Sequence, residues 1–200
     1  ISGVYTPDAG EIIIDGKVYT QLHPIEAIRE GIQVIYQDFS LFPNLTVAEN
    51  LALNHELAQG KHFVNWSEVR QIARDALDRI GVNLDLDAIV GELSVADRQL
   101  IAISRAMLHN AQLIIMDEPT TALTQREVET LFGIVRSLQE TGIAILFVSH
   151  KLNEVKAIAD TIMVFRNGRK VADDDADNFT LSSIVHHMTG REIDEQPYVY

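Results

Sequence analysis

Short apolar runs alternate along the chain with longer stretches whose apolar positions recur at helical spacing. The run at residues 113–116 consists of apolar side chains only, and Pro119 closes it shortly afterwards. Such a run predicts a strand that is buried on both faces, and the proline ends its hydrogen-bond ladder. Residues 143–148 predict another buried strand in the same way, and residues 32–36 predict a further strand that ends at Gln37.

Helical spacing fills much of the chain between these strands. The clearest case is residues 69–80, where apolar side chains recur at helical intervals and Gly81 follows. Shorter versions of the pattern predict helices over residues 24–30, 102–108 and 127–139. The order of strand, helix, strand, helix, strand predicts an α/β fold with a mainly parallel sheet.

Two hairpins and an inserted helical segment complete the predicted organisation. Asp15-Gly16 and Asn167-Gly168 each separate two short strand-like runs and predict tight turns. A mainly helical stretch follows the first core strand, which predicts a subdomain inserted into the core. We assign residues 1–40 and 106–190 to the α/β core, residues 41–105 to a helical subdomain, and residues 191–200 to the start of an interdomain linker.

The composition is that of an ordinary soluble globular protein, with 46% hydrophobic and 22% charged residues. A net charge of −13 argues against nucleic acid as a partner, because a phosphate backbone requires a basic surface. The absence of cysteine excludes disulfides and thiolate metal sites, which suits a reducing compartment. The acidic residues Asp173, Asp174, Asp175 and Asp177 could suggest a Ca²⁺ loop, but a central glycine is missing and Ile184 stands where the bidentate glutamate should be, so we expect a solvated acidic loop.

Polar side chains stand at the ends of the three predicted core strands. Gln37 follows the first strand, and Asp117 and Glu118 end the second; His150 follows the third. The carboxyl ends of parallel strands lie along one edge of a sheet, so these side chains can share a site. A carboxylate pair there suits nucleotide hydrolysis, with one carboxylate for Mg²⁺ and one to polarise the attacking water. Alternatively, the pair is an acidic turn, Gln37 begins a loop and His150 is a hydrogen-bonded structural residue.

Five segments, in the same order along the chain, resemble the motifs of ABC-type ATPases. They are residues 37–50 (Q-loop), 93–99 (LSVADRQ, where the family carries LSGGQ), 113–118 (Walker B strand and catalytic glutamate), 120–124 (D-loop) and 148–150 (H-loop). The resemblance implies a P-loop NTPase-like ABC ATPase core with an inserted helical subdomain. The DEPTTALT run and the MTGRE segment at 188–192 are similar to the first of two tandem domains in bacterial monosaccharide importers.

The resemblance also implies a role for each candidate residue. Asp117 would hold Mg²⁺, and Glu118 would be the catalytic carboxylate that orients and polarises the water. His150 would be a second catalytic residue that hydrogen-bonds the γ-phosphate, while Gln37 would contact Mg²⁺ or the water. Ser94, expected at a helix N-terminus, would donate to the γ-phosphate of an ATP held mainly by an opposing domain. ATP and Mg²⁺ are thus the implied cofactors.

The implied protein is the ATP-hydrolysing subunit of a bacterial ABC importer that energises uptake of a simple sugar or a related small polyol. Its partners would be membrane permease subunits, a second nucleotide-binding domain and, indirectly, a periplasmic sugar-binding protein. It would be a peripheral protein on the cytoplasmic face of the bacterial inner membrane. Two alternatives stay open: a non-transport ABC ATPase, and a non-catalytic ABC-type interaction module.

The sequence departs from the family's pattern in two places. It contains no GxxxxGKS/T motif, which in the family lies just before a segment like residues 1–3. We therefore expect the chain to follow the P-loop of a longer protein, to lack a central strand and to be inactive by itself. In the signature, Val95 and Ala96 replace two glycines and Asp97 replaces a glutamine. A carboxylate near a phosphate is electrostatically unfavourable.

Overall fold

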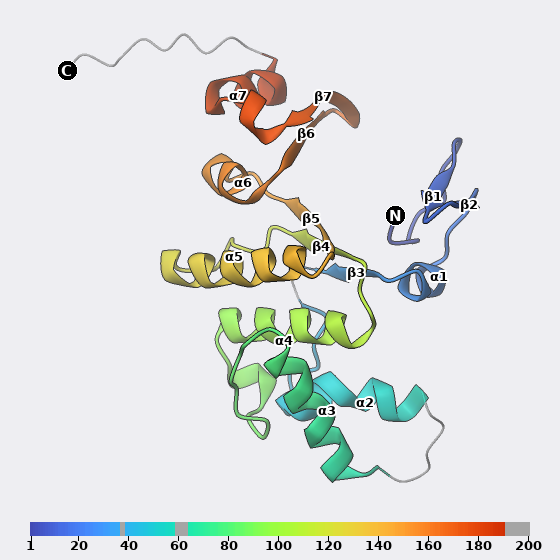
Figure 1. Cartoon of the computed structure of the whole chain (residues 1–200), viewed down its shortest axis with the longest axis vertical. Helices are drawn as coiled ribbons and strands as arrows, with labels where there is room; N and C mark the ends of the chain where they lie inside the picture. Colours follow the sequence, from blue (N-terminus) through green and yellow to red (C-terminus); the bar gives the residue numbers. More distant parts are fainter. Residues whose placement is uncertain (37–38, 59–63, 191–200) are drawn as a thin grey trace, which may run out of the picture. The chain divides into compact units, whose positions relative to one another are not determined.

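The computed structural model describes residues 1–36, 39–58 and 64–190 (Figure 1). The chain forms two compact units, which divide between Val148 and Ser149. The first unit contains a parallel sheet, a group of helices and an N-terminal hairpin. The second contains another hairpin together with short helices.

The sheet of the first unit is parallel throughout. Its strands lie in the order β3 (Ile32–Ile35), β4 (Leu113–Asp117) and β5 (Ala144–Val148) (Figure 1). The register aligns Ile35 with Met116 and Asp117 with Val148, so the carboxyl ends of the strands lie along one edge. This arrangement confirms the parallel α/β core predicted from the sequence.

Strand β5 differs from the prediction that both of its faces are buried. The helix α5 (Gln125–Glu140) covers one face, where the rings of Phe132 and Phe147 meet edge to face with centroids 5.9 Å apart. On the other face Leu146 and Val148 are 43% and 44% exposed. Among the described strands β5 pairs with β4 alone. The prediction was wrong for this face: an apolar run indicates that its side chains favour burial, but it does not show that other described residues pack over both faces of the strand.

The helices between β3 and β4 pack against one another around one apolar core. They are α2 (Val47–Ala58), α3 (Trp66–Asp78) and α4 (Val95–Leu108), with the 3₁₀ helix η1 (Val90–Glu92) just before α4 (Figure 1). α3 confirms the helix predicted at residues 69–80. α4 contains the predicted helical residues 102–108 and begins after Ser94, which caps its N-terminus as expected. No helix in the described part of the chain is both long and apolar enough to cross a bilayer.

The N-terminal hairpin and the helix after it also match the sequence pattern. The elements are β1 (Ile12–Ile14), β2 (Lys17–Tyr19) and α1 (Pro24–Arg29). Asp15 and Gly16 both have positive φ, at 47° and 78°, as the tight hairpin turn requires. Leu22, Ala27 and Ile32 form a small core that joins this region to β3.

The second unit is built around the other predicted hairpin. Its elements are α6 (Leu152–Ile158), β6 (Thr161–Arg166), β7 (Arg169–Asp175), the 3₁₀ helix η2 (Ala176–Asn178) and α7 (Leu181–Thr189). Asn167 and Gly168 form the turn with φ of 52° and 73°. The solvated loop predicted at residues 173–175 is wrong, because these residues pair with β6 as part of β7. Their backbone completes the ladder while their side chains stay exposed.

Candidate functional site

Strand β4 ends in two adjacent carboxylates that stand on a defined turn. Asp117 is the last residue of the strand and is exposed, while Glu118 is half-buried. Glu118 has a φ of 47°, a left-handed conformation that is costly for a residue other than glycine and is concentrated at functional sites. Its backbone N–H donates to the carbonyl oxygen of Val148 at 2.9 Å, which ties the turn to the end of β5.

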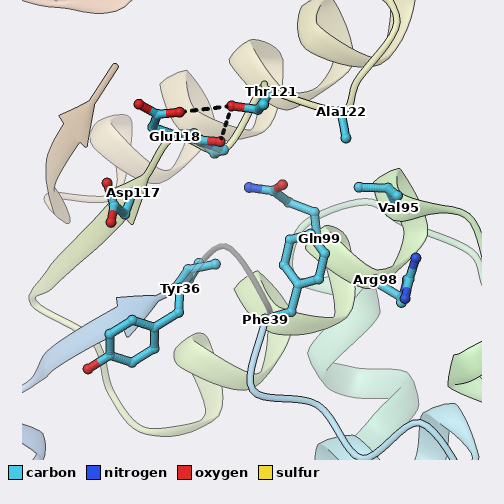
Figure 2. A pocket seen from close by; sticks show the side chains of 11 residues that line it. Tyr36, Phe39, Val95, Arg98, Gln99, Asp117, Glu118, Thr121 and Ala122 are labelled. Atoms are coloured by element: carbon cyan, nitrogen blue, oxygen red, sulfur yellow. Dashed lines mark hydrogen bonds between the residues drawn. The ribbon is translucent and has the colours of Figure 1, made fainter. Parts of the chain in front are cut away.

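Thr121 restrains the carboxylate of Glu118. The Thr121 hydroxyl lies 3.2 Å from the carbonyl oxygen of Glu118 and 3.2 Å from its Oε2 (Figure 2). A hydroxyl proton points to one acceptor at a time, so the two contacts alternate or share it. Either way the threonine limits the positions that the carboxylate can occupy, as suits a group that must aim an oxygen at a water molecule.

An open cavity of about 350 Å³ lies against this turn (Figure 2). Its lining comes from three stretches of the first unit: the end of β3 with Phe39, the first turns of α4, and residues 117–122. α4 contributes Val95, Arg98 and Gln99. The cavity therefore brings the two carboxylates to one side of a space whose opposite side is the N-terminal half of α4.

One wall of the cavity is held by an arginine of α4. The guanidinium of Arg105 donates to the carbonyl oxygens of Ser40 and Phe39 at 2.8 and 3.1 Å. Both of these residues have positive φ, 47° for Ser40 and 59° for Phe39. Burial lowers the pKa of Arg105 from its ordinary value, yet an arginine stays charged at neutral pH. The contact fixes an unfavourable backbone segment directly beside the cavity.

Ser94 occupies the helix N-terminus that the sequence predicted. As the N-cap of α4 it accepts a hydrogen bond from the backbone N–H of Asp97 at 3.1 Å. Its hydroxyl also donates to Oδ2 of Asp97 at 2.8 Å. The serine proton is thus engaged within its own helix turn. Ser94 is not among the described residues that line the cavity.

The structure gives no position relative to the carboxylates for the two remaining predicted site residues. Gln37 falls outside the described residues. His150 belongs to the second unit, in the segment that precedes α6. Of the predicted residues, Asp117 and Glu118 therefore share the cavity, and the roles of Gln37 and His150 stay predictions.

Sequence reasoning missed three residues that shape the site: Gln99, Arg105 and Thr121. A helix that starts at Val95 places Gln99 on the same face as Ile103 and Ala106, all three of which are buried. A glutamine in register with buried apolar residues is the signal that could have found it. For Thr121 and Arg105 no such signal exists, because their contacts depend on backbone conformation.

The carboxylates fit a magnesium ion that takes most of its ligands from elsewhere. Mg²⁺ prefers oxygen ligands and is commonly bound by one or two carboxylates together with phosphates and water. Asp117 offers an exposed carboxylate on the cavity, and Glu118 stands beside it. The described residues contain no group of three or more histidine, aspartate or glutamate side chains that could enclose a metal by themselves.

Comparison with known sequences identifies the family. The ABC transporter family model matches residues 1–121. The putative ribose/galactose/methyl galactoside import ATP-binding protein 2 of Agrobacterium fabrum is 42% identical over 193 residues, which are 96% of this chain and 38% of that protein. The ribose import ATP-binding protein RbsA of Bacillus licheniformis is 38% identical over 196 residues, 98% of this chain and 40% of that protein. The chain thus spans less than half of the length of these curated relatives.

Solved structures agree with the sequence relatives. The ATP-binding cassette MJ1267 of an ABC transporter, in its ADP conformation, has a TM-score of 0.76 and 26% identity, covering 93% of this chain and 75% of that one. The dimeric post-hydrolysis state of the ATP-binding cassette MJ0796, bound to ADP and Pi, has a TM-score of 0.73 and 25% identity, covering 90% and 78%. The chain therefore belongs to the ABC transporter family and has the mixed α/β fold of its ATP-binding cassettes.

Proposed function

We propose that the chain is part of the ATP-hydrolysing subunit of a bacterial importer for a simple sugar or a related small polyol. The observation that carries the hydrolytic part is the strained turn that holds the carboxylates of Asp117 and Glu118 on the cavity. The sugar-import part rests on the relatives, whose names describe ribose and galactose import.

The proposed chemistry divides the two carboxylates by position. Asp117, exposed at the strand end, would hold Mg²⁺, which when bound supplies positive charge to the phosphates. Glu118 would accept a hydrogen bond from the attacking water and orient it, while Thr121 limits the motion of its carboxylate. His150 would hydrogen-bond the γ-phosphate, and Gln37 would contact Mg²⁺ or the water.

Ser94 would act on a nucleotide held mainly by a second nucleotide-binding domain. To donate to that γ-phosphate its hydroxyl must leave Asp97, so the carboxylate competes with the phosphate for the same proton. We propose on this basis that the signature of this chain serves the weaker of two nucleotide sites. The further partners would be permease subunits and, through them, a periplasmic sugar-binding protein, with the subunit on the cytoplasmic face of the inner membrane.

We also propose that residues 1–200 alone neither bind ATP tightly nor hydrolyse it. The sequence contains no GxxxxGKS/T motif, whose backbone N–H groups and lysine cradle the phosphates in P-loop proteins. We further propose that the chain consists of an α/β core (residues 1–40 and 106–190), a helical subdomain (41–105) and the start of a linker (191–200).

ATP hydrolysis by the protein at its full encoded length tests the proposal. We expect Glu118→Gln to lower turnover by about a hundredfold or more while ATP still binds, because the loss of a general base typically costs that much. Glu129→Gln is the matched control, since it makes the same change at an exposed position on α5. Unchanged turnover in Glu118→Gln would place the working site in another domain and leave this one a regulatory or structural part.

A further inference from the structure

Gln99 is buried, and the polar atoms of its side chain make no hydrogen bond to the described residues. The residue is 1% exposed, and neither Nε2 nor Oε1 has a hydrogen-bond partner among the described residues. It lies in the second turn of α4 and lines the cavity. Figure 2 shows its carboxamide directed away from the helix, into the space beside the turn that carries Glu118 and Thr121.

A glutamine at this position is costly for the fold. Buried polar groups are almost always hydrogen-bonded, and a buried group without a partner destabilises the folded state. The nearby buried positions of α4, such as Ile101, Ala102 and Ile103, carry apolar side chains. An apolar residue of similar volume would pack at position 99 without that cost. The carboxamide therefore suits a partner that this arrangement of α4 and the turn does not supply.

The surroundings of Gln99 indicate what that partner is. The turn opposite has backbone groups as well as the Glu118 carboxylate, and a carboxamide can donate and accept at the same time. α4 also holds the far wall of the cavity through Arg105 and the carbonyl oxygens of Phe39 and Ser40. Any shift of α4 towards the turn would move Gln99 and this wall together, because both are attached to one helix.

We propose that Gln99 is a positioning residue of the hydrolytic site. In the nucleotide-bound cassette its carboxamide hydrogen-bonds the turn at residues 118–122 and fixes the direction of the Glu118 carboxylate. This role rests on the proposed ATPase function and adds to it a residue that lies outside the acidic turn. Gln99 acts through Glu118, so it affects the rate of the chemical step more than nucleotide affinity.

The test compares two glutamine-to-methionine changes in the protein at its full encoded length. Gln99→Met keeps the length of the side chain and removes its hydrogen-bonding groups. Gln33→Met is the matched control, because Gln33 in β3 also has an unpaired Nε2 but does not line the cavity. We expect Gln99→Met to lower kcat for ATP about tenfold with KM within about twofold, and to keep or raise the thermal unfolding midpoint. Gln33→Met should leave kcat unchanged.

The outcomes separate this role from the proposed function. If Glu118→Gln abolishes hydrolysis while Gln99→Met retains the wild-type kcat, the positioning role is wrong and the ATPase proposal stands. If Glu118→Gln hydrolyses ATP like the wild type, both proposals are wrong. A loss of activity in Gln99→Met that is matched by a lowered unfolding midpoint means a packing role and also overturns the inference.

A second variant keeps the test valid if Gln99→Met does not fold. Gln99→Glu preserves the shape but exchanges the NH₂ group for an oxygen. The new carboxyl would share the cavity with Asp117, Glu118, Arg98 and Tyr36. We expect kcat to be reduced at neutral pH and to recover relative to wild type as the pH falls, because a protonated carboxyl donates as the amide does. A ratio to wild type that does not vary with pH would overturn the role.

Discussion

The contact between Arg105 and the segment at residues 39–40 can be tested by the change Arg105→Met. The change deletes two hydrogen bonds from a charged donor, each worth about 1.5–3 kcal/mol. Two costs disappear with them: the desolvation that lowers the pKa of Arg105, and the left-handed conformations of Phe39 and Ser40 at about 1–2 kcal/mol each. We expect the segment to lose about 1–2 kcal/mol of local stability after this offset.

Native-state hydrogen exchange measures that loss at a single amide. The N–H of Phe39 donates to the carbonyl oxygen of Tyr36 at 2.9 Å and reports on the segment. A loss of about 1–2 kcal/mol corresponds to about 5- to 30-fold faster exchange at this amide in Arg105→Met. The amide of Ile143 should keep its rate, and Arg126→Met, at an exposed position of α5, should change neither amide. An unchanged rate at Phe39 in Arg105→Met would refute the reasoning.

Two further predictions concern the caps of the helices that flank the acidic turn. Asp97→Asn should destabilise the N-terminus of α4 by about 0.5–1 kcal/mol, because a negative charge there interacts favourably with the helix dipole. A double-mutant cycle with Ser94→Ala should show that the effects of the two substitutions are coupled. The cycle would contradict the contact if the two effects were simply additive. At the start of α5, the backbone N–H and hydroxyl of Thr124 lower the pKa of Glu127 below its ordinary 4.5. This cap should stabilise the folded state fully above about pH 4.5 and lose its contribution as the pH falls through the lowered pKa of Glu127. The unfolding midpoint of Glu127→Gln should therefore fall less steeply at acid pH than that of the wild type.

The acidic site was predictable from sequence because its information is local. An apolar run followed by Asp117, Glu118 and a proline specifies a strand, its end and two carboxylates at the ligand-binding edge. Both hairpins were predictable for the same reason, since an Asp-Gly or Asn-Gly pair accepts the positive φ of a tight turn. The roles of Asp117 and Glu118 in hydrolysis stay predictions.

The errors arose where tertiary context decides. Residues 173–175 have acidic side chains that disfavour strands, yet pairing with β6 makes them part of β7. The start of α4 after Ser94 was predicted correctly, but the hydrogen bonds between Ser94 and Asp97 were not, because residues 95–97 were interpreted as an altered signature. The burial of Gln99 was missed, although a helix that starts after Ser94 places it on the same face as the buried Ile103 and Ala106.

The left-handed backbone at Glu118 has a consequence for engineering this cassette. A glycine at this position would adopt the observed φ without strain, a gain of about 1–2 kcal/mol that only partly disappears through the greater chain entropy of unfolded glycine. It would also delete the carboxylate. If Glu118 has the proposed catalytic role, a thermostability screen that does not measure turnover would enrich inactive proteins at this codon, since heat tolerance and activity would favour opposite residues there.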